Sequence, residues 1–204
     1  MIDYNNPVPA PIANPSGLDA QIQPLQLELG QSLSWVSNSF GRAYKGIRKM
    51  SNMSGRSEYY PEVENINATD KDRYIAMLPN SRFGNFSFFY PKDPLEHTEV
   101  LLPSKPNNFL KQKVDWIFWG NLDTIAPNRD HRLTEKLKED VRLVIRNHTN
   151  FIISKEYGEA EEVFKGFDIK EVDNQYFKNP YFGFKFELDL TYRVNCLKQF
   201  NTYE

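Results

Sequence analysis

The chain has 204 residues, of which 40% are hydrophobic and 14% aromatic. A chain of this size and composition can bury a sizeable core without disulfides or a structural metal. Its formal net charge of −2 gives no overall attraction to nucleic acid or to anionic membranes, so any such binding has to be local. The single cysteine, Cys196, excludes an internal disulfide framework, and no apolar run approaches the roughly 18 residues of a membrane span. We therefore expect a soluble protein without a membrane partner.

Four prolines mark the first 16 residues, which favours an extended, polyproline-like arm without a core of its own. Apolar residues then recur at spacings of three and four, a pattern typical of one helix face. A proline deep inside a helix removes a hydrogen bond and clashes with the preceding turn. We therefore place Pro24 in the first turn and predict a helix from there to about Tyr44. The apolar stripe consists of Leu18, Ile22, Leu25, Leu29, Leu33, Val36 and Phe40.

The middle of the chain predicts a loop followed by strands. Residues 46–70 are polar and rich in turn formers, which indicates a long loop with at most a short strand near Tyr59. Three strands are predicted beyond it, at 73–78, 85–90 and 114–125. The third is apolar on both faces, as in a central strand that is covered on both sides. Four prolines lie between the second and the third strand, so we expect an unpaired loop there.

The last third of the chain predicts a second amphipathic helix at 133–147, then a short strand at 151–154, a helical turn closed by Gly166, and a strand at 167–172. The final strand, 182–194, alternates almost without error between apolar and polar residues. Seven apolar positions at period two indicate one buried face and one face that is wet or meets a polar partner. We expect this strand inside the main sheet, with one set of side chains against a helix. That set is Phe184, Phe186, Leu188 and Leu190.

Together these elements predict an α+β fold in which two amphipathic helices pack on a mostly antiparallel sheet, with a proline-rich N-terminal arm and long loops. We assign residues 1–16 to the arm, 17–196 to a single domain and 197–204 to a C-terminal tail. No internal repeat divides the chain.

No pattern in the sequence identifies a reaction centre. The three histidines, His97, His131 and His148, lack the spacing of metal ligands. Asp168 and Lys170 imitate the carboxylate-x-lysine end of a metal-dependent nuclease motif, but residues of such common type recur by chance. The lone cysteine could act as a nucleophile in principle, although a single cysteine is more often a packed hydrophobic residue. We therefore expect no enzyme activity, no metal and no cofactor.

The stretch from 42 to 56 carries five basic residues and no acidic one, a local charge of +5. A flexible basic loop could bind phosphates, contact an acidic neighbouring subunit or remain solvated, and these three interpretations stay open. The asparagine- and aromatic-rich segment 174–180 has the composition of an interface rim. The candidate contact residues are Arg42, Lys45, Arg48, Lys49, Arg56, Tyr176, Phe177 and Tyr181.

Seven segments of the chain together resemble the tail-terminator or neck (head-tail connector) proteins of tailed bacteriophages, in the variety carried by phages of Bacteroidetes hosts. They are RAYK at 42–45, YPEV at 60–63, FSFF at 86–89, VDWIFWGNL at 114–122, TEKLKEDV at 134–141, VDNQ at 172–175 and PYFGFKFE at 180–187. The resemblance extends over roughly residues 18–196 and lies in patterns of shape, which are not catalytic signatures.

This resemblance implies a small α+β subunit that closes into a homo-oligomeric ring between the head connector and the tail tube, a hexamer in tail terminators and a dodecamer in connector rings. Its partners would be the portal or connector and the tail proteins of the virion, with DNA passing through the ring. Assembly would take place in the host cytoplasm, and the protein would end in the neck or tail of the virion. Two other classes stay open, a nucleic-acid-binding adaptor and a metal-dependent nuclease.

Overall fold

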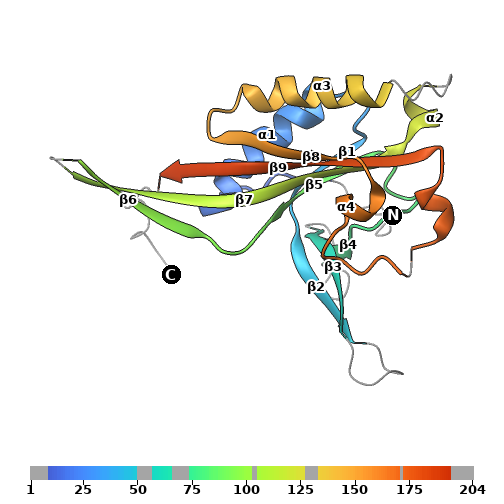
Figure 1. The fold of residues 1–204 in the computed structure, drawn as a ribbon, viewed down its shortest axis with the longest axis horizontal. Coiled ribbons are helices and arrows are strands. Elements are labelled where there is room, and N and C mark those ends of the chain that lie inside the picture. The colour runs from blue at the N-terminus through green and yellow to red at the C-terminus, as the bar shows by residue number, and fades with distance from the viewer. Residues whose placement is uncertain are drawn as a thin grey trace.

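The computed structural model describes residues 9–49, 57–65, 74–102, 105–126, 133–170 and 172–193, with the backbone alone at 48–49, 57, 98–102 and 105–108. These residues form a six-stranded main sheet, a three-stranded second sheet and several helices (Figure 1). The helices are α1 (Gly17–Ser32), α2 (Leu122–Ile125), α3 (Leu133–Arg146), α4 (Ala160–Val163) and the 3-10 turn η1 (Asn174–Phe177). The strands are β1 (Asn38–Arg42), β2 (Tyr44–Lys49), β3 (Ser57–Glu64), β4 (Tyr74–Ala76), β5 (Phe86–Pro91), β6 (Glu96–Leu102), β7 (Lys105–Asn121), β8 (Phe151–Tyr157) and β9 (Tyr181–Arg193).

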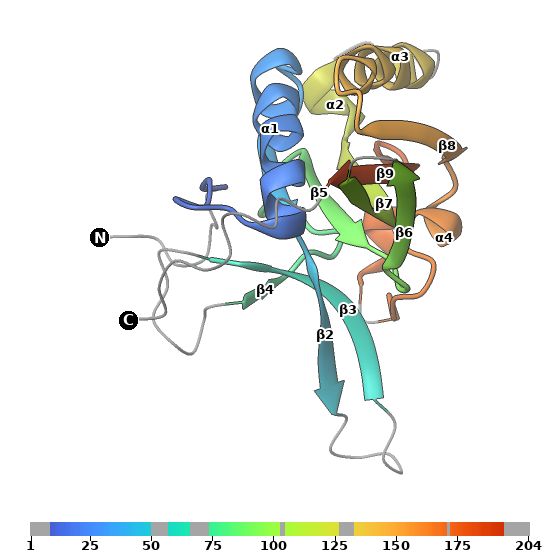
Figure 2. The same ribbon diagram turned by 90° about the vertical axis from the view of Figure 1, so that its left-hand side faces the viewer.

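The main sheet has the strand order β1-β5-β7-β9-β8, and β6 pairs with the first part of β7. β1 runs parallel to β5, and the other pairs are antiparallel. β7 and β9 lie side by side, with Trp116 opposite Phe186. Helices α1 and α3 both lie on one face of this sheet (Figure 1, Figure 2). The predicted α+β fold, a mostly antiparallel sheet packed by two helices, is confirmed. None of the helices in the described ranges is long and apolar enough to cross a membrane.

Strand β7 separates two hydrophobic clusters, because alternate side chains of a strand enter opposite faces of the sheet. Trp116 and Phe118 belong to the cluster under α1 and α3, whereas Ile117 and Trp119 belong to the cluster on the other face. That second cluster also receives side chains from β1, β3, β5 and α4. The prediction of a central strand covered on both faces is confirmed. The strand ends earlier than predicted, because the Asn121 side chain accepts a hydrogen bond from Asp123 N and caps α2.

Strand β9 lies between β7 and β8, as predicted for the final strand. The four apolar side chains predicted to pack against a helix are all buried in the cluster under α1 and α3, and Phe186 is fully buried. The opposite face differs from the expectation of a wet surface, since Lys185 and Glu187 are also buried. On this face Glu187 forms an ion pair with Lys92, and Lys185 donates a hydrogen bond to α4. These groups are the polar partner that the alternating pattern allowed in place of water.

Helix α1 differs from the prediction at both ends. It begins at Gly17, seven residues before Pro24, and it ends at Ser32. The proline lies on the exposed side of the helix interior, where its missing hydrogen bond and ring clash cost about 3 kcal/mol. Burial of an apolar side chain contributes about 1.5–3 kcal/mol, so the helix face outweighs this cost. That face consists of Leu18, Ile22, Leu25 and Leu29, and the rest of the predicted stripe is buried in the following turn and in β1.

Two stretches predicted as loops are β-hairpins. Residues within 46–70 form β2 and β3, which with β4 make the second sheet, and residues between β5 and the predicted third strand form β6. Pro61 lies in β3 opposite Lys45 of β2, and its carbonyl accepts a hydrogen bond from Met77 N at 2.7 Å. A proline is tolerated there because it precedes the first pair of β3 with β4, Glu62 with Ala76.

The remaining predictions are mostly confirmed. Helix α3 matches the predicted second helix to within one residue, β8 is longer than expected, and Gly166, at φ 97°, closes the turn after α4. Only glycine adopts such a left-handed conformation readily. The strand predicted at 167–172 is wrong, since the described part of that segment is irregular and Asp168 is bonded to β3 instead.

The burial of one face of β9 predicts how a substitution there changes the stability of the protein. Replacing Phe186 with Ala removes a fully buried ring at the centre of the main sheet, and we expect this to lower the free energy of unfolding by about 3–5 kcal/mol. Urea denaturation of the isolated subunit measures the change. The control is Ile152→Ala on β8, where the side chain is 65% exposed and the expected change is under about 0.5 kcal/mol. Equal effects of the two substitutions would contradict this packing.

Candidate functional site

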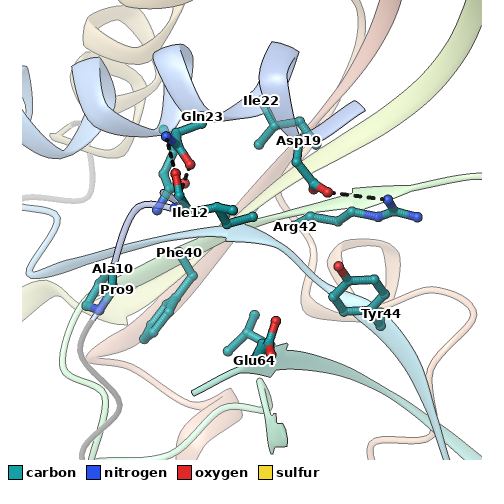
Figure 3. A pocket seen from close by; sticks show the side chains of 13 residues that line it. Pro9, Ala10, Ile12, Asp19, Ile22, Gln23, Phe40, Arg42, Tyr44 and Glu64 are labelled. Atoms are coloured by element: carbon teal, nitrogen blue, oxygen red, sulfur yellow. Dashed lines mark hydrogen bonds and ion pairs between the residues drawn. The ribbon is translucent and has the colours of Figure 1, made fainter. Parts of the chain in front are cut away.

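The described part of the N-terminal arm, residues 9–16, is fastened to α1 through one glutamine. Ile12 N donates to Gln23 Oε1 at 2.7 Å, and Gln23 Nε2 donates to Ile12 O at 3.1 Å (Figure 3). The side-chain amide therefore binds the arm in the way that a neighbouring strand would. Gly17, at φ 54°, then turns the chain from the arm into the helix. We call the surface beneath residues 9–12 the arm seat, and it consists of Asp19, Ile22, Gln23, Gln26, Phe40, Gly41, Arg42, Tyr44, Val63 and Glu64.

A cavity of about 50 Å³ remains between the arm and its seat. Asp19 and Arg42 face each other at its edge, with 3.9 Å between Oδ2 and Nη1 (Figure 3). Asp19 Oδ1 and Arg42 Nε are buried and have no hydrogen-bond partner in the part of the chain that the structure describes. Burial raises the pKa of the Asp19 carboxyl, and the nearby Arg42 charge opposes this shift only in part. Two polar groups of the seat are thus desolvated without being fully paired, which is unfavourable in the isolated subunit.

The hairpin formed by β2 and β3 begins beside the arm seat and leads away from the body of the protein (Figure 1, Figure 2). The Lys45 ammonium lies 4.1 Å from the centre of the Tyr59 ring, a cation-π contact on one face of the hairpin. On the other face Gly46 is covered by Tyr60, and a Cβ at Gly46 would lie 2.5 Å from that ring. Ile47 follows in β2 and is 58% exposed, although it is apolar. The hairpin therefore presents the apolar Ile47 together with charges of both signs, three basic residues in β2 and three acidic residues in β3.

Asp168 holds the hairpin to the rest of the protein, in addition to the burial of Val63 in the second hydrophobic cluster. Tyr59 N donates to Asp168 Oδ2 at 2.9 Å, and Asp168 N donates to Tyr59 O at 2.6 Å. The Asp168 carboxylate is therefore a structural hydrogen-bond acceptor for β3. Lys170, its partner in the nuclease-like pattern, is exposed to solvent.

The predicted contact residues separate into two places. Arg42 and Lys45 lie at the base of the hairpin, and Arg48 and Lys49 follow in β2, where the structure describes the backbone alone. Arg56 lies outside the described residues. Arg42 also lies in the arm seat, with its guanidinium 5.0 Å from the centre of the Tyr44 ring.

The aromatic candidates lie elsewhere, in η1 and at the start of β9. The Phe177 ring packs on Trp119, with 5.8 Å between the ring centres, and Tyr176 packs edge-on against Tyr181 at 5.1 Å. All three candidates are half-buried. They close the second hydrophobic cluster, so the structure does not bring them together with the basic residues.

A buried network of charges is the feature that the sequence prediction missed. The Lys92 ammonium lies 2.8 Å from Asp115 Oδ1 and 2.8 Å from Glu187 Oε2, and Lys185 lies 3.7 Å from Asp115 Oδ2. Asp115 and Glu187 are cross-strand neighbours in β7 and β9, which explains their proximity. Lys185 also donates to the carbonyl of Glu162 next to α4 and lies 4.6 Å from the centre of the Tyr157 ring.

The pKa values in this network follow from burial and pairing. Burial raises the pKa of the Asp115 carboxyl and lowers the pKa of the Lys185 ammonium. Glu187 differs, because its hydrogen bond from Lys92 holds its pKa below the usual value despite burial. Two carboxylates that are already paired with lysines are poor metal ligands, since the ammonium groups occupy their oxygens. The sequence contains one signal for this network, the charged residue Asp115 within a strand that is predicted to be buried on both faces. A buried charge requires a partner of opposite charge.

The remaining candidates have other surroundings. His148 Nε2 lies 2.7 Å from Glu28 Oε2 and joins the turn after α3 to α1. His97 is exposed on β6, while His131 and Cys196 lie outside the described residues. Within the described ranges no group of three His, Cys, Asp or Glu side chains is placed to hold a metal ion.

Comparison with known proteins does not identify the class of protein to which the chain belongs. No protein-family model matches the chain, and no curated protein matches it.

The charge network predicts a dependence of stability on pH. The pKa of Glu187 is lower in the folded protein than its usual value of 4.5, so its contribution is present above that pH and is lost as the pH falls through the lower, folded value. Glu187→Gln should therefore destabilise the protein at pH 7 and progressively lose this effect as the pH falls below 4.5. Urea midpoints measured over this range test the sign. The control is Glu161→Gln, which removes an exposed charge beside α4, and a constant deficit for Glu187→Gln at all pH values would contradict the assignment.

Proposed function

We propose that this protein is a structural subunit that closes into a homo-oligomeric ring at the head-tail interface of a tailed phage, as a tail terminator, neck or connector component. The observation that carries the proposal is the β2-β3 hairpin, which leaves the body of the protein with basic residues and the exposed Ile47 on it (Figure 1). The similarity of seven sequence segments to the tail-terminator and neck proteins supplies the class.

The physical argument starts from the weakness of an isolated hairpin. Two paired strands without a covering layer are marginally stable in water. The outer part of the β2-β3 hairpin lies beyond the pairs of β3 with β4 and has no third strand among the described residues, and Ile47 there remains largely uncovered. Packing against a neighbouring subunit would bury this side chain and would pair the basic residues with an acidic protein surface. Such a contact between different surfaces is the heterologous type that closes a ring by rotation.

A second projection supports the same interpretation. Among the described residues, β6 pairs with β7 alone, and β7 residues 105–108 continue past the last described pair with β9. Figure 1 shows this β6-β7 hairpin extending from the sheet in a different direction from β2 and β3. Two hairpins that point in different directions allow one subunit to reach two neighbours, either within one ring or in the adjacent layer of the virion. The portal or connector and the tail proteins are the neighbours that this position implies.

The basic stretch 42–56 also favours a second candidate, a nucleic-acid-binding adaptor. The local charge of +5 over residues 42–56 is sufficient for phosphate contacts, although the whole chain carries −2. In a ring the same residues would face either protein or the DNA that passes through. Mass measurement of the purified protein separates the candidates most directly. Stable particles of six or twelve subunits support the ring, whereas a monomer that binds DNA with a steep salt dependence supports the adaptor.

Charge reversal in the hairpin tests the proposed contact. We expect Lys45→Glu and Lys49→Glu together to prevent ring formation, because the reversed charges would repel an acidic neighbour. Arg42 and Arg48 are left unchanged, since a glutamate there would face Asp19 or Glu58 and would disturb the subunit itself. Native mass spectrometry gives the assembly state, and circular dichroism reports the fold.

The matched control reverses two exposed lysines outside the hairpin, Lys155 and Lys178. This control should still assemble. Normal rings formed by the hairpin variant would show that these basic residues are solvated and make no subunit contact.

A further inference from the structure

The arm seat points to an exchange of arms between subunits. We infer that residues 9–12 of each subunit bind the arm seat of a second copy of this chain. This inference rests on the homo-oligomer proposed above and names the surface and the segment that join its neighbours. In the isolated subunit, the same seat holds the subunit's own arm.

The first argument is the nature of the bond between arm and seat. Both hydrogen bonds of Ile12 are made through its backbone to the side chain of Gln23, and both are exposed to water. Nothing in these contacts depends on the arm and the helix belonging to one chain. A second copy can therefore supply the arm without the loss of any contact, and competition from water makes release of the original arm easy.

The second argument is the chemistry of the arm itself. Residues 7–12 read PVPAPI, so every second residue is a proline without an N–H group. The hydrogen-bond donors of this segment are therefore limited to alternate residues, of which Ile12 is one. Proline also keeps the chain stiff and extended, so little conformational entropy is lost when it docks on a new partner.

The third argument is the short connection between arm and helix. Residues 13–16 include Pro15 and lead into Gly17, and a short, restricted hinge of this kind favours exchange of the segment that it carries. Four extended residues span at most about 14 Å. The inference therefore requires the first turn of α1 to lie at the boundary between subunits.

The seat itself provides the fourth argument. The subunit's own arm leaves Asp19 Oδ1 and Arg42 Nε buried without a hydrogen bond and a cavity of about 50 Å³ next to them. A buried donor and a buried acceptor at one place fit the C=O and N–H groups of a further peptide segment. A second copy that closes over the start of α1 can supply such a segment, whereas the residues described in the isolated subunit do not.

A cross-linking experiment with mixed subunits tests the exchange. One preparation carries Ile12→Cys and the other carries Glu64→Cys, both with Cys196→Ser, and the two altered side chains line the same cavity (Figure 3). Each copy then has one thiol, so a link between position 12 and position 64 must join two copies. The preparations are mixed, allowed to assemble and treated with a short bismaleimide. We expect covalent dimers on a denaturing gel from the mixture and far fewer from either preparation alone.

The control replaces the Glu64→Cys preparation with Lys155→Cys, an exposed site on β8, and should give no such dimers. Gln23→Ala in the Glu64→Cys preparation should lower the yield of these dimers several-fold, because it removes both hydrogen bonds that hold the arm in the seat. The comparison is Gln175→Ala in η1, which should leave the yield unchanged.

Rings of normal mass without covalent dimers would overturn the arm exchange and leave the proposed function intact. If the protein remains a monomer at all concentrations, the proposed ring itself is contradicted. Internal links in a chain that carries both Ile12→Cys and Glu64→Cys would then assign each arm to its own seat.

Discussion

The antiparallel pairing of β7 with β9 is the constraint on which the other parts of the structure depend. Each strand is buried on both faces along most of the shared length, so a shift of one residue in the register would move every side chain to the wrong cluster. The aromatic rings fix this register, because Trp116 and Phe186 fill one face while Trp119 leaves room only for Gly183 opposite. A Cβ at Gly183 would lie 2.1 Å from the indole of Trp119. The position of both helices, the second sheet and the charge network follows from this pair of strands.

The buried charges lie where the pairing of β7 with β9 continues beyond the aromatic residues of the second cluster. Asp115 and Glu187 are opposite each other, and two carboxylates at that distance need cations. Lys92 and Lys185 supply them from β5's end and from β9 itself, under the cover of α4. A buried network of this kind contributes little net stability, but removing one member leaves an unpaired charge inside the protein. It therefore favours this register over alternatives, and it explains why the polar face of β9 is not wet.

The sequence was sufficient to predict the helices and strands in which apolar residues recur at one regular spacing. The alternation in β9 and the three-to-four spacing in α3 gave both type and position, because burial on one face dictates them. The errors arose where tertiary burial outweighs a local rule, as at Pro24 inside α1, or where prolines flank a paired strand, as on both sides of β6. The arm seat could not be predicted, since Asp19 and Gln23 meet Arg42 and Ile12 only after the chain has folded. Of the predicted contact residues, Arg42 alone belongs to it.

The way in which the sheet edges are closed indicates where a partner can bind. At one edge, Gln26 donates to the carbonyl of Ser39 in β1 and accepts the hydroxyl of the same residue through its own carbonyl. At the other edge, β8 carries an irregularity between Ile153 and Lys155, and Arg142 binds Glu156 through two hydrogen bonds. Side chains and irregularities of this kind are the usual protection against the addition of another strand. With these two edges protected against another strand, the two hairpins are the described segments that extend from the body of the protein toward a neighbour (Figure 1).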